Sequence, residues 1–393
     1  MILRWFLSGT VRQATDLCGQ VNKILNAQRD ILSPQAIDAI HKSVGELERA
    51  LREKQAKAGL LERMTQLEKV ANQWLKPYPH AGMRENVEVI LVAVAVALAI
   101  RTFFLQPFKI PTGSMQPTLY GITHENHRND PNFTIPTGWE KFVDSWFRGV
   151  SYFHEIAEAD GELQEVEAPK TVVPFVKKQR FLVGGRWHTL WFSADVDVLE
   201  RAGLKMRGSG EPVPHSFRQG EDIIKLKVVT GDHLFVDRLT YNFRRPTRGE
   251  IVVFETRGIK HPNVPEDQFY IKRLVGLGGE QIHIGEDQHL VINGQRLDAS
   301  TPGFENIYSF DPHAGENAYF GHVPTELFAD PSREYAVGKN GYLVMGDNTR
   351  SSLDSRYWGE VANQNVIGKG FFVYWPFLTN QRSGPGRFGL TSH

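Results

Sequence analysis

Hydrophobic residues in the first part of the chain recur at the three- and four-residue steps of amphipathic helices. Val11, Ala14 and Cys18 begin one such run, and further runs cover residues 37–51 and 60–74. Ser33-Pro34 precedes the second run, where serine is a favoured N-cap and proline a favoured first helical residue. The pattern predicts an α-helical region over residues 1–78. Its apolar seams are buried either by folding back of the helices, by self-association or by a partner.

The most apolar stretch follows a Pro-containing break at residues 76–80. Residues 89–100 read VILVAVAVALAI without a charge, and their neighbours bring the segment toward the ~20 residues of a membrane-spanning helix. The pattern predicts one transmembrane helix over residues 86–106; a buried core helix or strand is the alternative. Because Lys69, Lys76 and Arg84 precede the segment, the positive-inside rule places residues 1–78 in the cytoplasm and the later residues outside it.

From Phe108 onward the pattern changes to short runs of β-branched and aromatic residues between Gly and Pro turns. Such runs are typical of strands, and they include residues 171–176, 251–254, 269–275 and 371–375. This part has neither a strongly periodic helix nor an alternation of strands with helices, so we expect a mainly antiparallel β fold. A hairpin with a Gly-Gly turn is predicted over residues 181–192, with its aromatic side chains in the core.

Composition narrows the classes of function. The 393 residues include 45 Lys and Arg and 45 Asp and Glu, so the formal net charge is zero. A balanced charge gives no support for nucleic-acid binding, which needs a basic surface. The single cysteine, Cys18, allows neither an internal disulfide nor a zinc-binding pair and is expected to be buried. His124 and His127 lack the spacing of a metalloprotease helix, so no metal or cofactor is expected.

Two polar residues in the predicted β region are candidates for chemistry. Ser114 lies between Pro111 and Pro117, which make the segment extended and stiff and present the hydroxyl as a nucleophile. In a strand over 269–275, Lys272 shares a face with apolar side chains, and burial lowers the pKa of a lysine until it can accept a proton from a hydroxyl. A turn serine and a solvent-reaching lysine on an edge strand are the alternatives.

Four segments in order resemble the sequence boxes of bacterial type I signal peptidases, and the apolar segment stands directly before the first. These segments are 110–119 (IPTGSMQPTL), 248–254 (RGEIVVF), 270–277 (YIKRLVGL) and 346–356 (GDNTRSSLDSR). Each box alone is a modest signal, whereas four in the family's order are specific. The chain is therefore similar to this family, which implies a signal-peptidase-like antiparallel β region with a membrane anchor.

The resemblance implies a serine endopeptidase with a Ser–Lys pair. Ser114 would attack the scissile carbonyl, and neutral Lys272 would be the general base. The Ser114 backbone N–H and the Thr112 hydroxyl would form the oxyanion hole. Supporting roles fall to a further set of residues that orient the Lys272 amine or brace the loop around it: Ser352, Asp354, Arg356, Asp347 and Arg273.

This chain departs from the family in three ways. Gly278 stands where the family has a proline, which loosens a turn but leaves Lys272 alone. Thr349 and Arg350 stand where the family has Arg and Asp, which puts the corresponding ion pair in doubt. About a hundred residues also separate the first box from the next strands. We therefore expect a catalytic domain of residues 107–120 and 230–380, an inserted subdomain at 121–229 and a C-terminal tail at 381–393.

The expected location is the bacterial inner membrane, with a single span, a cytoplasmic N-terminus and an extracytoplasmic catalytic domain. The expected partners are the lipid bilayer and preprotein signal peptides cut after small residues at A-x-A type sites. A cytoplasmic partner of the N-terminal helices is also open, and nucleic acid is not expected. The alternative function is an inactive membrane-anchored binding protein on the same scaffold.

Overall fold

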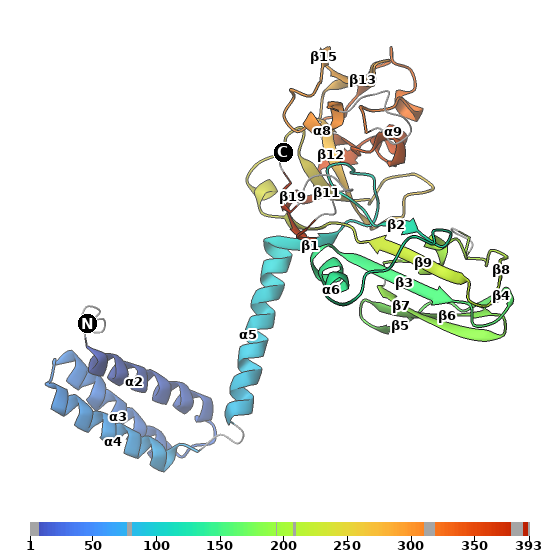
Figure 1. Ribbon diagram of the computed structural model, residues 1–393. Coiled ribbons are helices and arrows are strands. Elements are labelled where there is room, and N and C mark those ends of the chain that lie inside the picture. Colours follow the sequence, from blue (N-terminus) through green and yellow to red (C-terminus); the bar gives the residue numbers. More distant parts are fainter. Residues whose placement is uncertain are drawn as a thin grey trace. The chain divides into compact units, whose positions relative to one another are not determined.

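The computed structural model describes residues 8–76, 81–193, 195–206, 210–309, 319–378 and 388–391. The chain divides into two compact units, residues 1–95 and 96–393, and the division falls inside one helix (Figure 1). The apolar residues 1–7 and most of the predicted tail lie outside the described residues. The described part of that tail includes a short strand.

The N-terminal unit contains three helices that pack against one another: α2 (Gly9–Gln28), α3 (Pro34–Arg52) and α4 (Lys57–Trp74). Ser33 caps α3 by accepting a hydrogen bond from the Ala36 N–H, as its position before Pro34 predicts. The seams meet in one apolar core in which Leu25, Leu47 and Leu67 are almost completely buried. Folding back within one chain is therefore enough to bury them.

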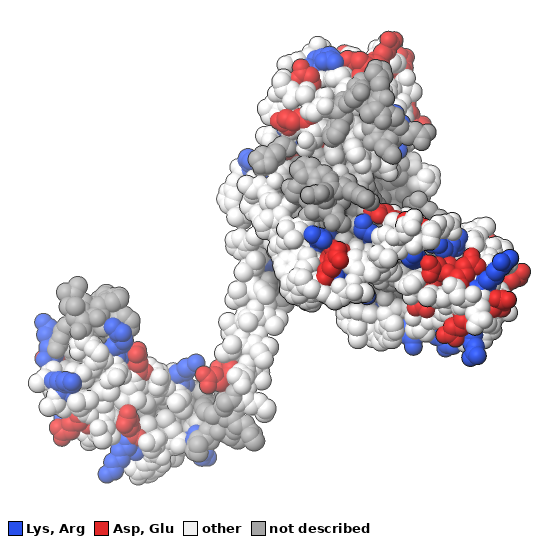
Figure 2. Space-filling model, in the orientation of Figure 1, with Lys and Arg blue, Asp and Glu red and all other residues white. Residues whose placement is uncertain are grey.

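Helix α5 (Ala81–Phe103) is the one helix among the described residues that is long and apolar enough to cross a membrane. Its stretch Glu85–Phe103 has a mean hydropathy of 2.0, and none of it is buried inside the protein. Figure 2 shows no charged side chain along the middle of this helix. A core helix would be covered by protein, so this exposure favours the membrane span over the buried alternative. The helix ends at Phe103 and the next strand starts at Leu105, so the helix is slightly shorter than the predicted segment, which ends at residue 106.

The second unit is built on an antiparallel eight-stranded sheet with the order β1-β10-β19-β11-β12-β17-β18, in which β20 pairs with β19. The strands are β1 (Leu105–Lys109), β10 (His233–Asp237), β11 (Ile251–Glu255), β12 (Phe269–Gly276), β17 (Gly341–Met345), β18 (Val361–Ala362), β19 (Val366–Trp375) and β20 (Gly389–Leu390). A smaller sheet, β15-β14-β13-β16, comprises β13 (Gln281–Ile284), β14 (Leu290–Ile292), β15 (Gln295–Arg296) and β16 (Tyr335–Ala336). The prediction of a mainly antiparallel β region is confirmed.

Residues 123–229 form two further sheets around an apolar core of their own. One has the order β2-β9-β3, from β2 (Thr123–Asn126), β3 (Val150–Ile156) and β9 (Asp222–Val229). The other contains β4 (Gly161–Val166), β5 (Lys170–Val173), β6 (Val176–Val183), β7 (Arg186–Ser193) and β8 (Ser216–Phe217). The run predicted as one strand at 171–176 is a hairpin, because the chain turns at Phe175, which has a φ of 74°.

Two predictions for this segment are wrong. The hairpin of β6 and β7 forms around Gly184-Gly185, but only Phe181 and Phe192 of its aromatic residues are buried; Trp187 and Trp191 are exposed because strand alternation turns them outward. The segment also contains an unpredicted helix, α6 (Gly138–Phe147).

The remaining helices of the second unit are short. They are α7 (Val198–Arg201), α8 (Glu305–Tyr308), α9 (Ser355–Trp358) and the 3-10 turns η1 (Thr240–Asn242), η2 (Glu326–Phe328), η3 (Thr349–Ser351) and η4 (Asn363–Asn365).

We expect Leu67→Ala to destabilise the N-terminal unit by about 2–5 kcal/mol, because it opens a cavity where the side chain is fully buried. Leu61→Ala, on the same helix but 43% exposed, is the matched control. Hydrogen exchange of the backbone amides in the full-length protein measures the effect: protection in α2–α4 should fall in the first variant only. Equal protection in both variants would contradict this packing.

Candidate active site

The structure brings Ser114 and Lys272 together although they are 158 positions apart in sequence. Lys272 Nζ and Ser114 Oγ are 2.7 Å apart, a hydrogen-bond distance. Both residues are buried, at 4% and 5% exposure. Lys272 is on β12 and Ser114 is in the turn that follows β1, so the pair joins two strands that lie far apart in the order of the large sheet. The alternative of a solvent-reaching lysine does not fit this burial, whereas Ser114 does lie in a turn, with its hydroxyl directed at the amine.

Burial is the main cause of the altered basicity of Lys272. Removing the ammonium from water disfavours its charged form and lowers the pKa of Lys272 to about 8, although the carboxylates of Asp354 and Asp347 act in the opposite direction. The amine also lies 5.6 Å from the centre of the Tyr270 ring, as expected for two residues on one strand face. Near pH 8 a large fraction of this amine is therefore uncharged and able to accept a proton.

A buried ion pair connects β12 to the segment that carries the nucleophile candidate. Arg273 Nε and Nη2 donate to the two Asp347 carboxylate oxygens at 2.8 and 2.6 Å. Thr118, four residues after Ser114, donates its hydroxyl to Asp347 at 2.5 Å. Arg273 Nη1 donates to the Gly249 carbonyl at 2.6 Å. Removing one partner would leave an unpaired buried charge, so this network fixes the position of Ser114 relative to β12.

A second buried ion pair shapes the loop after β17. Asp354 and Arg356 are fully buried, and the Arg356 side chain donates to both Asp354 oxygens at 2.9 Å. Burial acts to raise the pKa of Asp354, but the Arg356 guanidinium and the Gly346 N–H outweigh it and hold the pKa below its usual value. Thr349 also belongs to this network, because its hydroxyl accepts from Arg356 Nη1 at 2.7 Å and from the Val323 N–H at 2.7 Å.

Position 349 is one of the two positions in this loop that depart from the family pattern. The threonine there accepts a hydrogen bond from the guanidinium that holds the loop, so it takes part in the network without a charge of its own.

Asn348 was not assigned a role from the sequence, yet it holds the backbone of the nucleophile candidate. Its side-chain amide donates to the Gly113 carbonyl at 3.1 Å and its N–H donates to the Ser114 carbonyl at 3.0 Å. In a trans peptide the N–H points away from the carbonyl, so holding the Gly113 carbonyl fixes the direction of the Ser114 N–H. In the part of the chain that the structure describes, this N–H has no backbone or side-chain acceptor. The side-chain amide of Asn348 could have indicated this role from the sequence, but no role was predicted for it.

The structure places Ser352 near the pair, but without the predicted contact to Lys272. The Ser352 hydroxyl is buried and has no hydrogen-bond partner of good geometry among the described residues, Lys272 included. It lies against Gly346, where a β-carbon would collide with both Ser352 Oγ and the Ser114 carbonyl. Ser352 therefore lies against the segment that carries Ser114, and its hydroxyl also helps to lower the pKa of the neighbouring Asp354. Thr112 is exposed.

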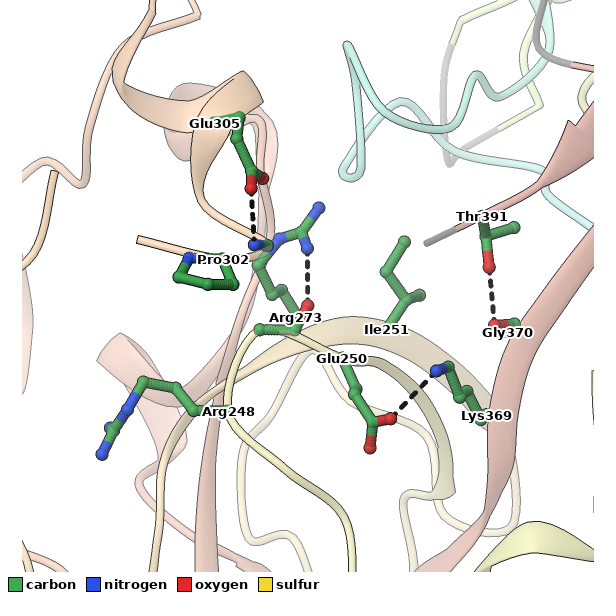
Figure 3. Close-up of a pocket in the computed structure, with 11 residues that line it drawn as sticks. Arg248, Glu250, Ile251, Arg273, Pro302, Glu305, Lys369, Gly370 and Thr391 are labelled. Atoms are coloured by element: carbon green, nitrogen blue, oxygen red, sulfur yellow. Dashed lines mark hydrogen bonds and ion pairs between the residues drawn. The ribbon is translucent and has the colours of Figure 1, made fainter. Parts of the chain in front are cut away.

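A separate pocket of about 290 Å³ lies on the other side of Arg273 and does not include Ser114 or Lys272 (Figure 3). Its charged side chains are engaged: Lys369 pairs with Glu250 at 2.9 Å and Arg248 pairs with Glu280 at 3.0 Å. Glu305 accepts from the Gly303 N–H at 3.1 Å with Oε1, while its Oε2 is buried and has no partner among the described residues. No group of three or more potential metal ligands occurs in the described ranges. The Ser114–Lys272 pair thus remains the strongest candidate for chemistry.

Known proteins share these segments. The family model described as signal peptidase, peptidase S26, matches residues 83–126 and 224–375. Signal peptidase I of Leptolyngbya laminosa is 32% identical over 155 residues, which are 39% of this chain and 65% of that protein, less than two thirds of its length. Signal peptidase I of Bacillus caldolyticus is 32% identical over 148 residues, which are 38% of this chain and 72% of that protein.

A crystal structure of a signal peptidase I from Enterococcus faecalis V583 has 29% sequence identity and a TM-score of 0.22, and the match covers 32% of this chain and 97% of that one. The residues that the family model matches include Ser114 and Lys272. The chain belongs to the signal peptidase family, peptidase S26.

We expect the free energy of unfolding to carry a pH dependence that originates at Lys272. Between pH 8 and the ordinary lysine value of 10.5, the unfolded chain binds a proton at this amine that the folded chain does not, so its contribution to stability rises with pH. The full rise is roughly 2–4 kcal/mol, and below pH 8 the cost of burying the charge is fully present.

Chemical denaturation in detergent at several pH values measures this effect as the difference between the wild type and Lys272→Met. Lys260→Met, which removes an exposed lysine, shows whether losing any lysine has the same consequence. A difference between wild type and Lys272→Met that stays constant from pH 7 to pH 10.5 would be incompatible with a buried amine of lowered pKa.

Proposed function

We propose that the chain is a membrane-anchored serine endopeptidase that removes signal peptides from exported preproteins, using Ser114 as nucleophile and Lys272 as general base. The observation that carries the proposal is the 2.7 Å contact between the two buried groups. Membership of the signal peptidase family supports it further. A serine hydroxyl is a weak nucleophile at neutral pH, and an adjacent uncharged amine activates it by accepting its proton.

In the proposed reaction, Ser114 Oγ attacks the scissile carbonyl while its proton passes to Lys272 Nζ. The resulting ammonium then protonates the leaving amine, which leaves an acyl-enzyme on Ser114. A water attacks this ester and gives a proton to Lys272; the resulting ammonium then protonates Ser114 Oγ as the acyl group leaves as a carboxylic acid, which restores the serine hydroxyl and the neutral amine. The Ser114 N–H, directed by Asn348, stabilises the oxyanion, and the Thr112 hydroxyl is the second donor.

The substrate would add to the free edge of β1. This strand is the first in the order of the large sheet and pairs only with β10 among the described strands. Phe108 on β1 meets the ring of Phe269 on β12 at a centroid distance of 5.6 Å, so the two strands approach each other next to the pair. An extended peptide bound along β1 by strand addition would lead toward Ser114. Small side chains at two positions, as in an A-x-A site, would fit this approach.

Cleavage of a preprotein in detergent is the direct test. We expect Ser114→Ala and Lys272→Met each to lower kcat at least about a thousandfold, because each removes one half of the proton transfer. Ser300→Ala and Lys260→Met, at exposed positions, are the matched controls and should cleave at the wild-type rate. Near-normal cleavage by either of the first two variants would disprove the roles of Ser114 and Lys272, and an inert wild type would favour the non-enzymatic binding protein.

Protease protection in sealed inner-membrane vesicles tests the topology. With α5 as a single span, residues 105–393 should be digested only when the protease is on the extracytoplasmic side, and residues 8–76 only when it is on the cytoplasmic side. An epitope at each end of the chain reports the two regions separately. Digestion of both regions from one side of the intact membrane would contradict the single span.

A further inference from the structure

Helix α6 has the reverse polarity of a helix that packs on a soluble protein. Its buried residue is charged: Asp144 is 4% exposed and accepts from Arg148 Nη1 at 2.8 Å and from the Tyr152 hydroxyl at 2.6 Å. One of its exposed faces is aromatic, since Trp139 and Trp146 are 75% and 66% exposed, whereas Glu140 and Lys141 are exposed elsewhere on the helix. An amphipathic helix normally turns its apolar face to the core, so packing within this unit does not explain the outward aromatic face.

The exposed aromatic residues continue beyond the helix into a single patch. The ring centroids of Trp139 and Phe142 are 5.1 Å apart, and those of Phe142 and Phe147 are 6.4 Å apart. The series continues from Phe147 to Phe377 at 6.3 Å. We call this surface the aromatic patch, which comprises Trp139, Phe142, Trp146, Phe147, Phe377 and Phe388. A continuous apolar surface of this kind marks a contact with a partner or a membrane.

The patch is fixed to the large sheet near the strand that continues α5. The Trp375 indole donates to the Trp146 carbonyl at 2.8 Å, and the Leu378 N–H donates to the Phe147 carbonyl at 2.9 Å. Trp375 pairs with His233 at one end of β10, while the Arg238 N–H at the other end donates to the carbonyl of Phe104, which follows α5. Strand β10 has five residues and spans roughly 15 Å, so about one strand length separates the patch from the end of α5. Figure 1 shows α6 beside β1.

The chemistry of these residues favours lipid as the occupant. Trp and Phe are the residues that collect at the boundary between lipid headgroups and hydrocarbon, where a large apolar ring and a polar tip are both accommodated. The exit of α5 carries the same kind of residues, with Phe103 and Phe104 exposed at 65% and 48%. A partner protein would not require the apolar surface to continue toward the end of a membrane-spanning helix.

We propose that α6 lies in the headgroup region of the bilayer and holds the catalytic unit against the membrane surface beside the exit of α5. This inference rests on the proposed membrane anchoring by α5. Helix α6 lies within residues 127–223, which the family model does not match. The proposed membrane contact of α6 therefore belongs to the inserted segment. With two points of attachment the active site would keep a defined height above the bilayer, close to where a cleavage site leaves the membrane.

Depth measurement on the full chain tests the proposal without relying on activity. Cys18 is the single cysteine, so Cys18→Ala gives a background in which a nitroxide can be attached at Trp139→Cys or, as control, at exposed Ser332→Cys. In liposomes of phosphatidylethanolamine and phosphatidylglycerol, the label at 139 should be reached by oxygen more readily than by a water-soluble nickel complex. The label at 332 should show the opposite preference.

Water-like accessibility of the label at 139 would overturn the proposal. Protection from both reagents, in liposomes and in detergent alike, would also overturn it, because a second copy or a bound protein would then cover the patch. If protease protection contradicts the α5 span, the anchoring on which this inference rests is lost. If protease protection supports the span but the label at 139 is exposed to water, only the α6 proposal is rejected.

A kinetic comparison provides a second readout. In the double variant Trp139→Ser with Trp146→Ser, KM for a preprotein in liposomes should rise about tenfold, whereas kcat for a short soluble peptide in detergent should not change. The double Trp→Phe variant should restore the wild-type KM. Loss of both activities in the Ser variant would mean that the helix supports the fold rather than the membrane contact. A wild type that cleaves neither substrate would disprove the proposed function while leaving the depth result valid.

Discussion

The site depends on keeping one amine out of water. Lys272 is 4% exposed, and the cost of burying its ammonium lowers its pKa to about 8. The same burial that creates a base also destabilises the fold while the amine is charged. The surrounding structure must therefore keep the amine buried, although its charged form is more stable in water. This constraint explains why the neighbourhood of a single lysine contains so many buried polar groups.

Two buried ion pairs provide that support, and each holds a different segment of the chain near Lys272. The Arg273–Asp347 pair joins β12 to the nucleophile segment through Thr118, and the Asp354–Arg356 pair gives the loop after β17 its shape. Buried pairs of this kind add little net stability, because desolvation offsets their attraction. Their contribution is positional: breaking one would leave a charge in the core, so alternative arrangements of the loop are strongly disfavoured.

The sequence allowed the fold class and the main chemical pair to be predicted, because they depend on local patterns. Helical spacing identified α2–α4, the uncharged run identified α5, and the four boxes brought Ser114 and Lys272 into one hypothesis. Orientation was harder to predict. Trp187 and Trp191 look like core residues in a sequence, but which face of β7 they occupy depends on the sheet packed behind it. Helix α6 was missed because its buried side is polar and its aromatic side faces outward, the opposite of the usual signal. Asn348 was missed because its role is to hold a backbone carbonyl rather than a side chain.

The separation of 158 positions between the two central groups also has a temporal consequence. The strand with the amine and the loop that braces it are synthesised after the serine, and the intervening segment has to fold before they meet. In the proposed topology, a growing chain would carry an inert hydroxyl next to its candidate membrane-spanning helix. Reactivity would arise only when nearly the whole polypeptide has reached its final compartment, which would spare the nascent protein, and its neighbours in the export machinery, from premature cutting.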